Sequence, residues 1–141
     1  MSRNRKGINL GEGACVFVME RSPDGVQLRG VGESCDAHHM SSPEPHGYGA
    51  QSAMQNALKN AEMNPDEIQY LNLHGTGTRL NDEMEARAVK NTFSSVPFCS
   101  STKPSFGHCL GAAGSIEAGI CWMLLNSATN SERQITLPPH Y

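Results

Sequence analysis

A helical pattern is clearest between residues 47 and 63. Small and apolar side chains recur there at intervals of three and four positions, at Ala50, Ala53, Met54, Ala57, Leu58 and Ala61. This spacing places them on one face of an α-helix. We therefore predict a helix over residues 47–63, ended by Asn64-Pro65-Asp66.

Several short apolar runs have the length and composition of β-strands. The first two cover residues 14–20 and 26–31, and Ser22-Pro23-Asp24-Gly25 lies between them. Such a sequence is typical of a turn, so these runs predict two strands joined by that turn. Further strands are expected at residues 70–73, 96–101 and 134–137.

Two more helices complete the pattern. One is expected to begin near Asn81 or Asp82, either of which can cap it, and to carry Met84, Ala88 and Val89 inward. The other is expected over residues 111–125, and the small residues at its start imply close packing against a neighbour. The alternation of strands and helices predicts an α/β fold with helices layered on a sheet.

Composition narrows the possible partners and compartment. The 141 residues are 38% apolar, which is enough for one core. A net charge of -3 argues against nucleic acid or an anionic membrane as partner. Because no apolar run reaches the roughly 18 residues of a membrane span and no leader pattern follows Met1, we expect a cytoplasmic protein. Five cysteines without a Cys-x-x-Cys pair indicate reduced thiols, with neither disulfides nor zinc.

Two loops carry the residues most suited to chemistry. His74 lies in His-Gly-Thr-Gly-Thr after one predicted strand, and His108 lies in Lys-x-x-x-Gly-His after another. Loops at strand ends are where α/β proteins place active sites. The spacing by itself leaves open whether the two histidines share a site or are structural.

Four blocks of sequence, taken together, resemble the β-ketoacyl-acyl-carrier-protein synthases of the thiolase superfamily. They are GINLGEGA at residues 7–14, SCDAHHMSSP at 34–43, HGTGT with the following ND and E at 74–85, and SSTK through GH and LGAAG at 100–114. The resemblance implies the C-terminal half of a thiolase-like α/β fold, with a mixed sheet between helix layers that is incomplete at both ends. It further implies that residues 1–31 are the last strands of the N-terminal half, and that residues 32–141 are the C-terminal domain without its final strands.

The resemblance also implies a reaction. In that family a cysteine carries the acyl chain as a thioester, malonyl carrier protein loses carbon dioxide, and the resulting enolate attacks the acyl carbonyl. His74 and His108 would donate hydrogen bonds to the malonyl thioester carbonyl as negative charge develops on it. Lys103 would pair with Glu85 and set the electrostatic field near the histidines.

Carrier-protein binding follows from the same resemblance. Thr76 and Thr78 would contact the phosphopantetheine arm of acyl carrier protein, and Ser41 stands where many relatives have a threonine with a similar role. Apart from that arm as the substrate carrier, no bound cofactor is expected. No metal is expected either, because the histidines at positions 38, 39 and 46 lack any particular ligand spacing. Asp82 could orient the loop after His74 or simply cap a helix.

No cysteine of this chain matches the family's nucleophile motif. Cys109 precedes a helix whose N-terminus could lower a thiol pKa, but its family position is variable and we do not assign it the role. We therefore expect the chain to be inactive alone. The expected partner is acyl carrier protein. The sequence leaves open whether a separately encoded N-terminal half is a further partner or the chain is a fragment of a gene, and whether the family's homodimer forms here.

The sequence thus predicts part of a 3-oxoacyl-acyl-carrier-protein synthase of fatty-acid or polyketide biosynthesis. Two alternatives are a non-catalytic partner like the chain-length factors and a carrier-protein binding module. The joint presence of His74, His108 and Lys103 favours the synthase, since a non-catalytic partner does not need them. The short turn at residues 22–25 is typical of a specialised branch such as the aryl-polyene synthases.

Overall fold

The computed structural model describes residues 4–129. Its helices and strands follow in chain order as α1 Tyr48–Ala61, the 3-10 turn η1 Pro65–Glu67, β1 Tyr70–Asn72, α2 Arg79–Thr92, β2 Phe98–Ser100, α3 Lys103–Phe106, the 3-10 turn η2 Leu110–Ala112, and α4 Ala113–Thr129. The strand predicted at residues 134–137 lies outside the described residues.

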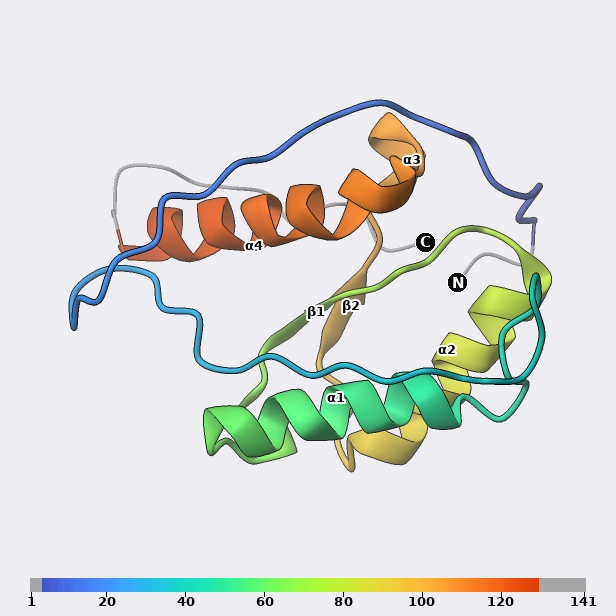
Figure 1. Ribbon diagram of the computed structural model, residues 1–141, viewed down its shortest axis with the longest axis horizontal. Helices are drawn as coiled ribbons and strands as arrows, with labels where there is room; N and C mark the ends of the chain where they lie inside the picture. The colour runs from blue at the N-terminus through green and yellow to red at the C-terminus, as the bar shows by residue number, and fades with distance from the viewer. Residues whose placement is uncertain (1–3, 130–141) are drawn as a thin grey trace.

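The two strands form a parallel pair in which Leu71 of β1 is opposite Cys99 of β2. Helix α4 lies on one side of this pair, and α1 and α2 lie on the other (Figure 1). The predicted α/β class is therefore confirmed. Because parallel strands point the same way, the loops that follow β1 and β2 leave the pair at the same edge.

The packing of α1 against α2 forms the main core among the described residues. Ala88 of α2 is fully buried, and Gly47 precedes α1 in a left-handed conformation with φ 77°. A Cβ at Gly47 would come within 2.8 Å of the Met84 carbonyl oxygen, so only glycine allows α1 to begin so close to α2. The helix predicted over residues 47–63 is thereby confirmed, with bounds shifted by one and two residues.

Two helix starts differ from the prediction. Helix α2 begins at Arg79, two residues before the predicted cap, because the Asp82 amide already donates to the Thr78 carbonyl over 3.0 Å. Helix α4 begins at Ala113 after the turn η2, and the short helix α3 occupies the predicted loop. The expected close packing is found at Ala113, which is buried, whereas Gly111 and Gly114 face open space.

The two strands predicted before α1 are absent. Residues 14–20 and 26–31 form no β-ladder, and the isolated bridge outside β1 and β2 pairs Leu10 with His108. The first segment runs beside α4, where Cys15 approaches Gly119, and the second runs beside α1, where Gly30 approaches Ala57. A strand requires a neighbouring strand to satisfy its backbone groups, and neither segment has one in the described part of the chain.

Candidate active site

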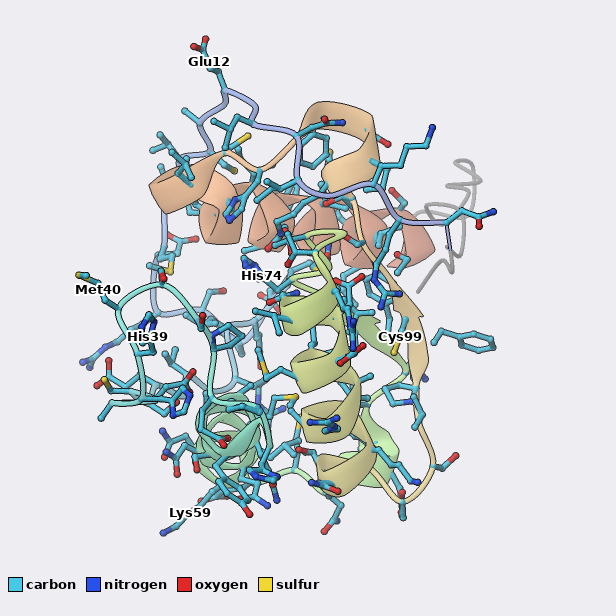
Figure 2. All side chains as sticks on the ribbon, turned by 90° about the vertical axis from the view of Figure 1, so that its right-hand side faces the viewer. Glu12, His39, Met40, Lys59, His74 and Cys99 are labelled. Carbon is cyan, nitrogen blue, oxygen red and sulfur yellow. The ribbon has the colours of Figure 1, made fainter. Side chains whose placement is uncertain are left out.

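The loops after β1 and β2 bring the two singled-out histidines together. The rings of His74 and His108 lie edge to face, with centroids 5.0 Å apart and an interplanar angle of 86°. They come from segments separated by more than thirty residues of sequence, so the parallel pairing of β1 and β2 creates the contact. Figure 2 shows His74 beside the start of α2, in the middle of the molecule.

The N-terminal segment ties both loops together. The Gly7 amide donates to the Gly77 carbonyl over 3.1 Å, the His108 amide donates to the Asn9 carbonyl over 2.7 Å, and the Gly11 amide donates to the His108 carbonyl over 3.1 Å. A Cβ at Gly11 would lie 1.9 Å from the Phe106 carbonyl oxygen. Glycine at this position of the first sequence block therefore lets the N-terminal backbone lie against the Phe106 backbone, where no side chain would fit.

One hydrogen bond determines how the His108 ring can act. The Leu110 amide donates to Nδ1 of His108 over 3.1 Å, and Leu110 adopts φ 49° to do so. This conformation is costly for a leucine and is typical of functional sites. Because Nδ1 accepts, the proton of the neutral imidazole lies on Nε2, which becomes a hydrogen-bond donor.

His74 is held in its neutral form. Loss of hydration at the ring, with the positive charge of Lys103 and the neighbouring His108 ring as further causes, lowers the pKa of His74 to about 4, and Asp82 opposes this only in part. Although His74 counts among the exposed residues of this chain, the surrounding protein removes enough water to disfavour the imidazolium ion. At neutral pH this ring therefore carries one N–H donor and no charge.

Glu85 fixes the backbone of the first histidine loop. Its carboxylate accepts the His74 amide over 2.6 Å and the Gly75 amide over 2.8 Å. Burial raises the pKa of Glu85, while these two amides and the charge of Lys103 act in the opposite direction. The Glu85 carboxylate, which belongs to α2, thus holds the loop by the loop's backbone amides.

Lys103 does not form the predicted ion pair with Glu85. Its ammonium group is buried and pairs instead with Glu117, one turn into α4. The reason is that α3 and α4 follow each other closely, which brings Glu117 beside Lys103, while the Glu85 carboxylate is occupied by backbone amides. Sequence reasoning missed Glu117, although its place in the helix after His108 is a signal that could have found it.

Thr76 and Thr78 face each other on the same loop. Their hydroxyl oxygens lie 2.9 Å apart, and the Thr78 amide also donates to the Thr76 hydroxyl over 3.3 Å. Thr76 lines a hollow of about 340 Å³ that is also bounded by Lys103 and by residues of the N-terminal segment. Neither His74 nor His108 lines this hollow, so the hollow is distinct from the histidine pair.

Ser41 lies apart from these residues. Its amide donates to Nδ1 of His39 over 3.1 Å, and no hydrogen bond described for residues 4–129 joins it to the histidine loops. Figure 2 shows His39 and the adjacent Met40 on a loop away from His74.

Cys109 is buried, and no group of three or more His, Cys, Asp or Glu side chains in the described part of the chain could hold a metal ion.

Sequence comparison places these residues in a known context. Residues 26–132 match the family described as beta-ketoacyl synthase, C-terminal domain. Nodulation protein E of Rhizobium leguminosarum bv. trifolii is 42% identical over 135 residues, which is 88% of this chain and 33% of that protein. The 3-oxoacyl-[acyl-carrier-protein] synthase 2 of Staphylococcus aureus is 43% identical over 126 residues, 81% of this chain and 31% of its own length. The chain thus spans about a third of the length of these relatives.

Solved structures agree with the sequence comparison. A chain of the complex between the ketosynthase ApeO and its chain length factor ApeC, from Xenorhabdus doucetiae, is 55% identical, with a TM-score of 0.72 over 76% of this chain and 27% of that chain. A structure of the ishigamide ketosynthase/chain length factor is 27% identical, with a TM-score of 0.75 over 89% of this chain and 33% of that chain. In residues 4–129 we find no helix with the length and apolar character needed to cross a membrane.

Proposed function

Because this chain belongs to the β-ketoacyl synthase family, as a match to its C-terminal domain, we propose that it supplies the hydrogen-bond donors for decarboxylative condensation. The substrates would be an acyl thioester and a malonyl thioester carried on the phosphopantetheine arm of acyl carrier protein. Thr76 and Thr78 would bind that arm. Ser41 is the weakest of the proposed contacts, since it lies on a separate loop.

The proposed reaction assigns one role to the histidine pair. When the malonyl carboxylate leaves as carbon dioxide, the electron pair of the broken bond stays on the α-carbon and spreads onto the thioester oxygen. The ring N–H groups of His74 and His108 would donate to that oxygen and stabilise its negative charge. The α-carbon then bonds to the acyl carbonyl carbon, and the acyl carbon-sulfur bond breaks with its electron pair on the nucleophilic sulfur.

The histidine contact is the observation that supports this proposal. The two rings meet edge to face, Nδ1 of His108 is occupied by the Leu110 amide, and the pKa of His74 is lowered to about 4. The last two of these features favour neutral rings, each with one N–H group to donate to the reacting oxygen. Lys103, paired with Glu117, would maintain the positive field that keeps His74 neutral, and Glu85 would hold the loop.

The nucleophile would come from an N-terminal ketoacyl synthase half. No cysteine of this chain matches the family's nucleophile motif, and Cys109, which follows His108, is buried. Gly111 and Gly114, close in sequence to His108, face open space where such a half could approach. Residues 1–31 would complete the sheet of that half, with residues 32–141 forming the second domain.

The test is reconstitution. The 141-residue chain is mixed with the N-terminal half of a related ketoacyl synthase that retains its cysteine, and release of carbon dioxide from malonyl carrier protein is measured. We expect turnover, and we expect His74→Ala and His108→Ala each to lower its rate by about 100-fold or more, as for loss of an oxyanion donor. His46→Ala is the control, because His46 stacks on Tyr48 in a separate loop and its loss should leave the rate unchanged.

Two results would contradict the proposal. A folded complex that binds carrier protein without releasing carbon dioxide would favour a binding module or a non-catalytic partner. Turnover that survives the loss of either histidine would show that other groups stabilise the enolate.

A further inference from the structure

Ser101 links the two loops that carry the histidine pair. It directly follows β2, and its hydroxyl donates to the Gly75 carbonyl over 3.0 Å. The same oxygen accepts the Lys103 amide at 3.4 Å, a longer and weaker contact. One side chain thus connects the residue after His74 to the residue that pairs with Glu117.

The Gly75 peptide is held from two directions. Its amide donates to Glu85 of α2, and its carbonyl accepts from Ser101 on the β2 side. Gly75 adopts φ 46°, and a Cβ there would lie 2.5 Å from the Ser101 Cβ. The close fit leaves the loop little room to shift while the Ser101 contact remains.

The hydrogen bonds of Glu85 and of Ser101 to Gly75 have different consequences for the site. Glu85 fixes the His74 loop to α2, whereas Lys103 and His108 belong to the chain after β2. Backbone hydrogen bonds already join those two parts, both through the N-terminal segment and through the Leu73 amide, which donates to the Ser100 carbonyl over 2.8 Å. The Ser101 hydroxyl adds a side-chain hydrogen bond that reaches the residue next to His74.

We propose that Ser101 is a positioning residue, whose hydroxyl holds the His74 loop in register with Lys103 and His108. The inference rests on the function proposed above and adds a residue to its site. Ser101 itself would touch neither substrate nor reacting atoms. Its loss should let the His74 ring move away from Lys103 and His108 and become better hydrated.

The first test uses the 141-residue chain alone. Histidine ring signals are followed by NMR against pH in the unsubstituted chain, in Ser101→Ala and in Ser94→Ala. Ser94 is a matched control, because its hydroxyl bonds Asp66 over 2.8 Å at an exposed site after α2. We expect Ser101→Ala to raise the pKa of His74 by about one unit or more toward its ordinary value, and Ser94→Ala to leave it unchanged. Equal titration in all three chains would overturn the proposal.

A second measurement tests the proposal even if the Ser101→Ala chain does not fold. In the unsubstituted chain, a nuclear Overhauser effect between the Gly75 α-protons and the Ser101 β-protons is expected, and its absence from assigned spectra would refute the link. In the reconstituted enzyme, Ser101→Ala should lower kcat about tenfold with KM little changed. If the unsubstituted chain shows no turnover at all, the proposed function fails, and the titration still decides the role of Ser101.

Discussion

The imidazole of His74 shows how the fold changes the chemistry of a single residue. Burial, together with Lys103 and His108, lowers its pKa from 6.5 to about 4. Between these two values the unfolded chain binds more protons at this residue than the folded chain does. The contribution of His74 to the free energy of unfolding therefore rises as pH increases from about 4 to 6.5, and falls again on acidification.

This shift can be measured directly. We expect the His74 ring to titrate near pH 4 in the 141-residue chain when its carbon-bound proton is followed by NMR. Lys103→Gln should raise the pKa of His74, because it removes a positive charge that disfavours the imidazolium ion. Lys59→Gln, which removes an exposed charge on α1, is the control and should have no effect. A His74 midpoint at 6.5 in the unsubstituted chain would contradict the prediction.

At the scale of elements, the contact between α1 and residues 30–33 depends on glycine. Cβ atoms at Gly30 and Gly32 would lie 2.3 Å and 2.0 Å from carbonyl oxygens of α1. The side-chain amides of Asn56 and Asn60, which belong to α1, donate to the backbone carbonyls of Glu33 and Val31. The extended segment is thus held by helix backbone and side chains instead of by a neighbouring strand.

Gly32→Ala should consequently destabilise the chain. The added methyl group has no space beside the Ala53 carbonyl, so α1 must shift, at a cost of about 1–3 kcal/mol. Gly114→Ala is the matched control, since its Cβ would face open space and the change should stay within about 0.5 kcal/mol. Urea unfolding followed by circular dichroism measures both. Equal stability of the two variants would show that the segment does not pack on α1 as described.

At the scale of the whole molecule, the described residues leave many large apolar side chains exposed. Val16 and Val18 are 89% and 98% exposed, and Trp122 and Met123 of the apolar helix α4 are about half exposed. Such a contiguous apolar surface beside unpaired backbone is typical of an interface.

Val18→Lys tests whether this surface receives the N-terminal half. Because Val18 makes almost no contact within the chain, the variant should fold normally and aggregate less by light scattering. Its affinity for the N-terminal half, measured by calorimetry, should fall about tenfold or more, since a charge would be buried. Leu80→Lys places the same charge on α2, at a side chain 60% exposed, and should bind as the unsubstituted chain does. Unchanged affinity of Val18→Lys would exclude this surface as the contact.

Local patterns were sufficient for much of this protein. The apolar spacing predicted α1, the short runs predicted β1 and β2, and the four sequence blocks identified the family, because these features depend on neighbouring residues and on motif order. The histidine pair could be singled out for the same reason, since each ring stands in a glycine-rich loop after a strand.

Only the tertiary structure decided which partners these residues have. Residues 14–20 and 26–31 have the composition of strands, but strand formation requires a neighbour that local sequence does not contain. Lys103 pairs with Glu117 instead of Glu85 because α4 folds back beside α3, and the two histidine rings meet because β1 and β2 are parallel. Each of these contacts joins two different elements or loops, and its geometry depends on how they pack.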